Sequence, residues 1–224
     1  MPKGSTAASN APPEAPLDCP LCPRLFDFRT INARTHPDWY NAPVPSFGDI
    51  AGRLLIVGLA PGLQGANKTG RPFTGDYAGD LLYSTLEKFG FSIGKYEARP
   101  DDGVKLRDAI ISNAVRCVPP ENKPTGAEII TCRQFLVSRI SHLPNIKVII
   151  ALGRIAHDST VRALGHKPNA AVFGHGKRYT LAGPHGAVTL HSSYHCSRYN
   201  TNTGRLTEDM FHNVFVAAKR DLEA

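Results

Sequence analysis

The chain has 224 residues, 42% of them hydrophobic, and a formal net charge of +7. This length and composition suit one globular domain with a full hydrophobic core. No apolar run approaches the roughly eighteen residues that a membrane-spanning helix needs, so no membrane span is expected. The positive charge permits binding to nucleic acid but does not require it.

The first residues predict a tail and not a targeting signal. Residues 1–16 are small, polar and rich in proline, and they lack the apolar stretch of a signal peptide. Such a composition is typical of disorder. We therefore expect a disordered tail over residues 1–16, one domain over residues 17–224, and a cytoplasmic, nucleoid-associated protein. A short helix is expected over residues 17–28.

The stretch from Leu54 to Asp76 predicts a strand followed by a ligand-binding loop. Its first residues, 54–57, form a short apolar run rich in branched side chains, as in a buried strand. Glycines and prolines then form a long loop over residues 58–76, which can bring backbone N–H groups close to a ligand. A helix pattern follows over residues 77–88. A strand, a glycine-rich loop and a helix in this order build the binding site of an open parallel sheet.

The rest of the chain alternates strands with helices. Thr125 and Glu128 have the spacing of a helix capping box. Strands are expected over residues 109–115, 147–152 and 187–190, helices over residues 125–141, 154–164 and 207–222, a surface loop over residues 92–103, and a hairpin or irregular excursion over residues 167–183. This order predicts the α/β class, as a three-layer α/β/α sandwich with a central, mainly parallel four-stranded sheet.

Each polar motif follows one of the predicted strands. Residues 58–76 follow the first strand, Asn122 the second, Gly153 the third, and residues 191–200 the fourth. Parallel strands all end on the same side of a sheet, and the crevice there is the usual ligand site. Loops more than a hundred residues apart are therefore expected to line one pocket.

One interpretation of the first loop is a phosphate cradle. Residues 62–69 nearly fit the pattern G-x-x-x-x-G-K-[ST] of nucleotide hydrolases. Asn67 stands where the second glycine should be, and that glycine is what lets the loop wrap a phosphate. Moreover, no later apolar strand ends in an Asp that could hold Mg²⁺.

Five cysteines point to a metal site. Cys19 and Cys22 form a C-x₂-C pair, and Cys117 and Cys132 lie further along the chain with fourteen residues between them. In a cytosolic protein such spacing favours a metal over a disulfide. Zinc and a [4Fe–4S] cluster both accept four thiolates, and the spacing does not separate them. Cys196 is expected to be a free thiol.

Two segments together resemble the uracil-DNA glycosylase superfamily. The first is Gly-Leu-Ala-Pro-Gly at residues 58–62, followed by Thr-Gly-Arg-Pro-Phe-Thr-Gly-Asp at residues 69–76. The second spans residues 191–207; it contains a counterpart of the His-Pro-Ser motif, with Cys196 at the proline position, and ends in Thr-Gly-Arg-Leu-Thr. The chain looks most like family 5, the iron–sulfur type B enzymes. That resemblance implies a structural [4Fe–4S] cluster on Cys19, Cys22, Cys117 and Cys132.

The resemblance also implies which residues carry the chemistry. His195 aligns with the family histidine and would donate to O2 of the departing base, with His191 as the competing candidate. Leu59 stands where related families hold a polar residue, so Asp76 would orient the attacking water, although it could instead only cap the next helix. Asn122 would help to position the water or the base, in preference to Asn113; alternatively it is a simple turn residue.

Base and DNA contacts follow from the same resemblance. A base must leave the helical stack to reach such a pocket, and Phe73 is the ring on which it would stack; alternatively Phe73 is a core residue. The expected base-binding residues are Gly58, Leu59, Ala60, Pro61, Gly62, Phe73, Asn122 and His195. The expected phosphate-binding residues are Lys68, Arg71, Lys123, Arg198 and Arg205. A loop over residues 198–203 would wedge into the vacated stack, or would be an ordinary polar loop.

The sequence thus predicts a monomeric, monofunctional DNA repair enzyme. It would hydrolyse the N-glycosidic bond of uracil in double-stranded DNA, with some activity on hypoxanthine or other deaminated or damaged bases. No lysine is placed as a nucleophile for a Schiff base, so strand cleavage is not expected. Two alternatives are a metal-stapled DNA-binding module without catalysis and a P-loop-like nucleotide hydrolase.

Overall fold

The computed structural model describes residues 12–224, and residues 1–11 lie outside the description. The larger helices are α1 (Pro23–Thr35), α3 (Tyr77–Lys88), α4 (Gly126–Ser141), α5 (Arg154–Ala163) and α7 (Glu208–Glu223). Shorter helices are α2 (Ala66–Thr69), α6 (Arg198–Asn202) and the 3₁₀ turns η1 (Pro120–Asn122) and η2 (Pro168–Ala170). Strands are β1 (Phe47–Gly48), β2 (Leu54–Gly58), β3 (Ser92–Ile93), β4 (Lys105–Leu106), β5 (Ala109–Asn113), β6 (Val148–Leu152), β7 (Arg178–Gly183) and β8 (Gly186–Ser193).

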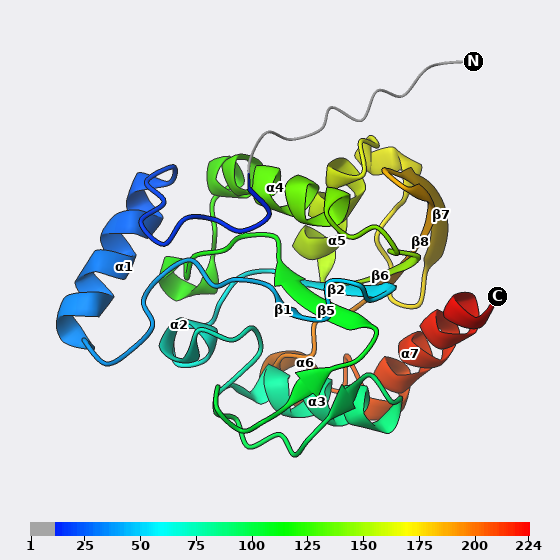
Figure 1. The fold of residues 1–224 in the computed structure, drawn as a ribbon, viewed down its shortest axis with the longest axis horizontal. Helices are drawn as coiled ribbons and strands as arrows, with labels where there is room; N and C mark the ends of the chain where they lie inside the picture. The colour runs from blue at the N-terminus through cyan, green and yellow to red at the C-terminus, as the bar shows by residue number, and fades with distance from the viewer. Residues whose placement is uncertain (1–11) are drawn as a thin grey trace.

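The main sheet has six strands in the order β1-β5-β2-β6-β8-β7. The four inner strands β5, β2, β6 and β8 run parallel, and the two edge strands β1 and β7 pair antiparallel to them. In Figure 1 the sheet lies between α4 and α5 on one face and α3 and α7 on the other. The predicted three-layer α/β/α architecture with a mainly parallel sheet is therefore confirmed.

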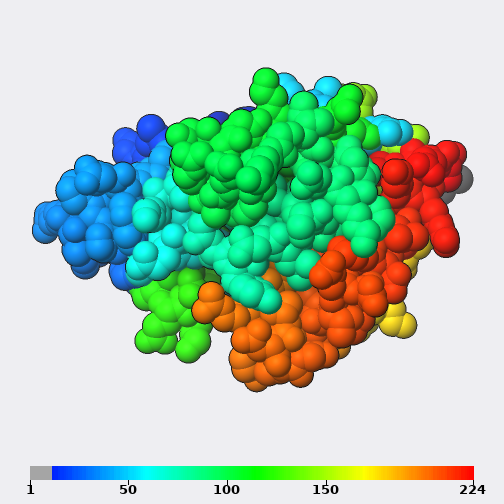
Figure 2. All heavy atoms as spheres, turned by 90° about the horizontal axis from the view of Figure 1, so that it is seen from below, coloured from blue at the N-terminus to red at the C-terminus, as the bar shows by residue number. Residues whose placement is uncertain are grey.

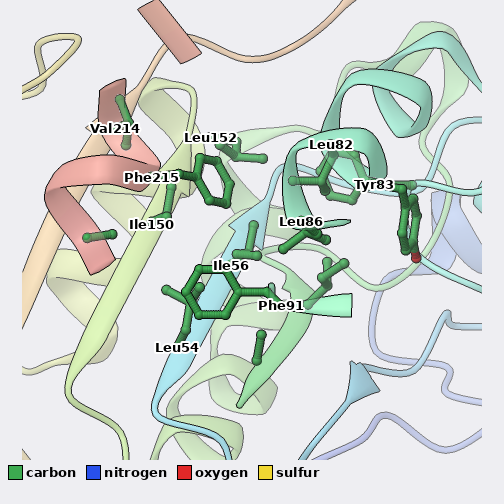
Figure 3. Close-up of a cluster of buried hydrophobic side chains, with 14 of the residues drawn as sticks. Leu54, Ile56, Leu82, Tyr83, Leu86, Phe91, Ile150, Leu152, Val214 and Phe215 are labelled. Carbon is green, nitrogen blue, oxygen red and sulfur yellow. The ribbon is translucent and has the colours of Figure 1, made fainter. Parts of the chain in front are cut away.

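Alternation along the buried strands divides the core into two layers. In β2, Leu54 and Ile56 face the side of α3 and α7, whereas Leu55 and Val57 face α4 and α5. Figure 3 shows the first layer, in which side chains of β2 and β6 meet those of α3 and α7. Because successive side chains of a strand point to opposite faces, apolar residues at every position indicate a strand covered on both sides.

The sheet is wider than the four predicted strands. The hairpin that was one of the alternatives for residues 167–183 forms edge strand β7, and β1 is a two-residue strand in a segment rich in proline. Such short or glycine-rich edges lack a clear apolar alternation. Residues 92–103 contribute β3, which pairs with β4 as a separate two-stranded sheet, and are not simply a surface loop.

Two helices differ from expectation at the ends of the chain. The helix expected over residues 17–28 begins only at Pro23 and continues to Thr35, because proline fixes the backbone of a first helical turn but donates no hydrogen bond inside one. Residues 198–203 are not a loop: Ser197 caps the short helix α6 by accepting the Asn200 N–H at 3.4 Å.

The described end of the predicted tail is packed against the domain. Glu14 pairs with the guanidinium groups of Arg116 and Arg139, and Ala15 packs beside the cysteines. The packed part of the chain thus begins before Leu17, while the rest of the predicted tail lies outside the described residues. Within residues 12–224, no helix combines the length and the apolar character needed to span a membrane.

Candidate active site

A pocket of about 480 Å³ opens where the parallel strands end. Its walls come from the loop after β2, the start of α3, the end of β5, η1, and the segment after β8. Figure 2 shows two of these segments side by side, residues near 195–205 in orange and residues near 60–80 in cyan to teal. The lining residues are Leu59, Ala60, Pro61, Gly62, Leu63, Gln64, Gly65, Ala66, Phe73, Asp76, Tyr77, Ala78, Asn113, Asn122, His195, Ser197 and Arg198.

Phe73 and His195 lie in this same pocket. Their ring centroids are 5.9 Å apart and their planes differ by 25°. The backbone of Phe73 has a φ of 53°, in the left-handed region that costs a bulky residue about 1–3 kcal/mol. A Cβ on Gly58 would lie 2.6 Å from the Phe73 ring and 2.4 Å from Asn113 Oδ1. Gly58 therefore lets both side chains pack against the strand end.

His195 stands at the pocket wall as a neutral imidazole. Burial lowers its pKa to about 4, so the ring is uncharged at pH 7. Its backbone is held on two sides: Asn200 Nδ2 donates to the His195 carbonyl at 2.8 Å, and His175 Nδ1 accepts the Tyr194 N–H at 3.1 Å. A neutral imidazole can donate from one nitrogen only, which suits a single hydrogen bond to a leaving group.

His191, the competing histidine, is placed elsewhere. It lies within β8, is buried, and its Nε2 is 2.7 Å from Asp221 Oδ2 of α7. Arg178 completes this group with two further bonds to Asp221. His191 therefore ties β8 to α7 and does not line the pocket.

Asp76 caps the helix that follows it and also lines the pocket. One carboxylate oxygen accepts the Gly79 N–H at 3.1 Å and caps α3. The other faces the loop after β2, where a Cβ on Gly65 would come within 2.4 Å of it and one on Gly62 within 3.1 Å. Burial raises the pKa of Asp76 above its ordinary value. The side chain is thus fixed by the cap with its second oxygen at the pocket.

Two asparagines line the pocket at different depths. Asn122 is exposed at the rim, on a turn in which it and Glu121 both have left-handed backbones, with φ of 56° and 55°. Asn113 is buried at the end of β5, against Gly58 and Phe73. The sequence pattern favoured Asn122; the signal for Asn113 is its place as the last residue of a parallel strand.

The predicted phosphate-binding residues divide into one that is buried and four that are exposed. Arg71 is buried and makes two 2.7 Å bonds to Asp102, so its assignment to a phosphate is wrong. Its partner lies 31 residues away, and sequence alone does not show that pairing. The four exposed cations are Lys68 over Trp39, Lys123 next to Glu121, Arg198 over Tyr77 at the pocket, and Arg205 over Tyr194.

A second hollow adjoins the pocket on the far side of His195. It has a volume of about 340 Å³, and Arg154 and Arg205 are among the residues that line it. Arg154 stacks over Phe173, 5.2 Å from the ring centroid. Arg154 was not among the predicted contacts, although its place directly after Gly153 at the end of β6 marked it as a residue of the same crevice.

The loop after β2 does not have the form of a phosphate cradle. Asn67, at the position of the second glycine, is fully buried and donates from Nδ2 to Asn41 Oδ1 at 2.9 Å. Lys68, which should reach the phosphates, lies over Trp39 instead. These contacts argue against the nucleotide hydrolase.

The four predicted metal-binding cysteines, Cys19, Cys22, Cys117 and Cys132, line one small cavity between α1, the segment after β5, and α4. All five cysteines are free thiols, including Cys196. Among residues 12–224, no three His, Cys, Asp or Glu side chains have the geometry of a metal-ion site. A four-iron cluster is larger than one ion and holds its thiolates further apart, so four cysteines that line one cavity are compatible with a cluster.

Buried positive charge surrounds these cysteines. Arg29, Arg116 and Arg139 are all buried, and each has an Nε without a hydrogen-bond partner. Among the described residues Glu14 is the one carboxylate paired with Arg116 and Arg139. Four thiolates holding a metal centre carry a net negative charge of about two units, which would balance the excess. The Arg116 N–H also donates to Cys132 Sγ at 3.2 Å. The residues present therefore fit a four-thiolate centre.

Comparisons with known proteins identify the family of this chain. The model of the family described as "Uracil DNA glycosylase superfamily" matches residues 45–219. A type-5 uracil-DNA glycosylase of Thermus thermophilus is 44% identical over 208 residues, covering 90% of this chain and 93% of that protein. One of Pyrobaculum aerophilum is 37% identical, with 92% and 89% covered. A type-4 uracil-DNA glycosylase of Sulfurisphaera tokodaii is 28% identical, with 90% and 80% covered.

Proposed function

The chain belongs to the uracil-DNA glycosylase superfamily, enzymes that hydrolyse N-glycosyl bonds, and on that premise we propose that it removes uracil from double-stranded DNA and leaves an abasic site. The observation that carries the proposal is the pocket itself. An aromatic ring, an amide, a neutral imidazole and a half-buried carboxylate, from loops far apart in sequence, line one cavity. These are the groups needed to bind a flat base and cleave it from a sugar.

Base binding is assigned to Phe73 and Asn113 together with the backbone of residues 58–62. The Phe73 ring offers a face for stacking, and the Asn113 amide offers both a donor and an acceptor to the edge of a base. Gly58 and Gly62 keep the backbone close to the ligand because they have no side chain. Thymine differs from uracil by one methyl group, so its rejection would depend on contacts at that edge.

Cleavage of the N-glycosidic bond requires that the charges developing on the base and on the sugar are both stabilised. Loss of the base leaves a cationic sugar and an anionic base, so a donor is needed at the base oxygen and a negative group or an oriented water at the sugar. Neutral His195 supplies the donor. The free Asp76 oxygen faces the pocket, and Asn122 at the rim supplies a second polar group for the water. Because the cap holds Asp76, little reorganisation is required on reaction.

Exposed groups around the mouth suit a DNA duplex. Arg198 lies at the pocket and Arg205 in the adjoining hollow, where each can reach a backbone phosphate. Tyr199, between Arg198 and Asn200 on α6, is 72% exposed and projects a ring beside the pocket. Such a ring can occupy the space that an extruded base leaves in the stack, which offsets part of the cost of extrusion.

We assign a structural [4Fe–4S] cluster to Cys19, Cys22, Cys117 and Cys132. The shared cavity and the unbalanced buried arginines support this assignment. When bound, the cluster would supply negative charge and four covalent ties between α1, the segment after β5, and α4. The cysteines lie apart from the lining of the active-site pocket, so the cluster takes no part in the hydrolysis.

The pocket also suits a wider set of damaged bases. Its volume of about 480 Å³ exceeds what one uracil needs, and about half of its lining residues are apolar. Hypoxanthine and other deaminated bases could therefore enter. The pocket is formed by one chain, so the enzyme would act as a monomer, and its substrate places it with the DNA in the cytoplasm. We expect hydrolysis without strand cleavage.

One assay tests the proposal. Purified protein is incubated with a duplex that carries one uracil, and alkali then cleaves any abasic site. Wild-type protein should give the cleaved product, whereas Asp76→Asn and His195→Ala should each lose about 10²-fold or more in rate. Tyr179→Phe, at a residue that does not line the pocket, serves as the matched control and should retain full activity.

Three further substrates sharpen the assay. Single-stranded DNA with uracil measures the preference for a duplex, and duplexes with hypoxanthine or thymine measure the breadth of the pocket. DNA that is bound with its uracil intact would instead identify a binding module without catalysis. Full activity in His195→Ala would overturn the role of the histidine and leave that of Asp76 to stand.

The pH profile of kcat/KM separates the two groups. Asp76 acts as a carboxylate, and burial raises its pKa. As the pH is lowered, activity should therefore be lost at a higher pH than for an ordinary aspartate. His195 stays neutral down to about pH 4, so no step is expected near pH 6.5. Asp76→Asn should remove the acid limb. A rise in activity as the pH drops through about 6.5, absent in His195→Ala, would show that the charged imidazole is the active form.

A further inference from the structure

The backbone of Phe73 is held in its unfavourable conformation by residues outside the pocket. A phenylalanine with a φ of 53° persists only where its surroundings leave it no relaxed alternative. The hydrogen bonds that impose this conformation come from α3 and from residues 96–104, a segment that contributes nothing to the pocket lining. The base-stacking ring therefore depends on groups that never touch the base.

Two tyrosine hydroxyls bind the backbone on either side of the Phe73 peptide. Tyr96 donates to the Phe73 carbonyl at 3.1 Å and accepts the Gly75 N–H at 3.4 Å. Tyr83 of α3 donates to the Pro72 carbonyl at 3.0 Å. The two tyrosine rings are stacked, with centroids 4.3 Å apart and an interplanar angle of 12°. Each ring thus fixes the other while both hold the loop.

A buried ion pair anchors the tyrosines. Arg71 makes two bonds of 2.7 Å to Asp102, and its Nε donates to Thr74 Oγ1 at 2.7 Å. Its guanidinium lies 5.2 Å from the Tyr83 ring centroid and 5.7 Å from that of Tyr96. Asp102 also accepts the backbone N–H groups of Glu97 at 3.0 Å and of Val104 at 3.1 Å. The pair joins the segment that carries Tyr96 to the loop that carries Phe73.

We propose that Tyr96, Tyr83 and the Arg71–Asp102 pair form a clasp that positions the Phe73 ring for base stacking. They are positioning residues, since none of them lines the pocket. The clasp acts on the binding of the base, because stacking is made in the ground state as well as in the transition state, so its loss raises KM more than it lowers kcat. This inference rests on the proposed base-excision function.

Tyr96→Phe tests the clasp with the smallest change to the fold. It removes one hydroxyl and keeps the stacked ring, so the protein should unfold within a few degrees of wild type. We expect the inhibition constant of free uracil and the KM for uracil-containing duplex to rise about fivefold to tenfold, with kcat within about twofold. Tyr179→Phe removes a hydroxyl that donates to Val172 instead and is the matched control.

A double-mutant cycle shows whether Tyr96 acts through Phe73. Phe73→Leu removes the ring, so adding Tyr96→Phe to it should change KM and the inhibition constant by less than about twofold. Equal effects of Tyr96→Phe with and without the ring, or no effect on wild-type protein, would overturn the clasp. Failure of wild-type protein to release uracil would overturn the proposed function instead, so the two failures are distinguishable.

Discussion

Two regions of this molecule bury arginine side chains, and they solve the same electrostatic problem differently. Behind the pocket, Arg71 is matched by one buried carboxylate, Asp102, with two bonds of 2.7 Å and further backbone donors to the carboxylate. Beside the cysteines lie three buried guanidinium groups: Arg116 and Arg139 share Glu14, Arg29 donates to backbone carbonyls, and each leaves its Nε unpaired.

The difference shows which region balances its buried charge with protein groups alone. A buried ion pair is tolerated when its geometry is good and its remaining donors and acceptors are satisfied, whereas an uncompensated buried charge is costly. The Arg71–Asp102 region meets this condition with protein groups. The cysteine region does not, and burial raises the pKa of Cys117 to about 12 and of Cys132 to about 11, so as free thiols they supply no charge at neutral pH. A metal centre that bound the cysteines as thiolates would supply that charge.

Removing a cysteine ligand should have the largest effect. In Cys117→Ala or Cys132→Ala the iron and the visible absorbance should be lost, and the free energy of unfolding should fall by at least about 3–5 kcal/mol, because the buried arginines lose their counter-charge. Iron content per chain and the thermal midpoint measure this. Cys196→Ser, the remaining cysteine, should keep its iron. A variant that loses iron without losing stability would break the comparison.

Asp102→Asn should come next. It leaves Arg71 buried without a counterion, and the free energy of unfolding should fall by about 3–5 kcal/mol, a drop of roughly 10 °C in the thermal midpoint. Asp101→Asn makes the same substitution at the neighbouring exposed carboxylate and should leave the midpoint nearly unchanged. Iron content should stay at the wild-type level in both variants, because neither residue belongs to the cysteine region.

Acid should then separate the two regions. Arg71 holds the pKa of Asp102 well below its usual range, so the stability that this pair contributes is present above about pH 3.9 and is lost as pH falls below it. Thermal midpoints from pH 6 to pH 2.5 should therefore decline less steeply at the acid end in Asp102→Asn than in wild type. Identical slopes would show that the pair contributes no acid sensitivity.

The smallest effect is expected at Glu14. Its carboxylate is partly exposed, and the proposed metal centre would also balance the charge of the buried arginines. Glu14→Gln should therefore lower the free energy of unfolding by about 1 kcal/mol in iron-loaded protein. The cost should grow when the same substitution is combined with Cys132→Ala, because Glu14 is then the remaining counterion among residues 12–224. Denaturant unfolding of the four proteins measures the coupling; a cost that is equal in both backgrounds would mean that the two charges act independently.

Local signals placed much of the fold. Helix α4 begins after Thr125 as the capping box requires, with the Glu128 N–H donated to Thr125 Oγ1 at 3.3 Å, and it ends at Ser141 as expected. Helix α3 occupies the predicted residues 77–88 behind its Asp76 cap. These features are made by residues a few positions apart, so the sequence displays them directly. Strand β1 lacks such a signal, and helix α6 has the cap Ser197 but only five residues; neither element was anticipated.

The active site was harder to read because its residues are joined through space. The sequence placed Phe73, Asp76 and His195 near one crevice from the rule that parallel strands end together, and the structure brings them into one pocket. It did not distinguish an exposed arginine from one that is buried in an ion pair, so Arg71 was assigned to a phosphate and the exposed Arg154 was not considered. Whether a cation is free depends on a partner anywhere in the chain, and for Arg71 that partner is Asp102.

The order of strands and helices, the caps and the cysteine spacing belong to the sequence by itself, because each arises from neighbouring residues or from a repeating pattern along the chain. The left-handed backbone of Phe73, the two-sided use of Asp76 and the excess of buried positive charge beside the cysteines were decided only by the tertiary structure. Each of these is a property of groups that meet across dozens of residues, where burial removes water and leaves the surrounding side chains to settle conformation and charge.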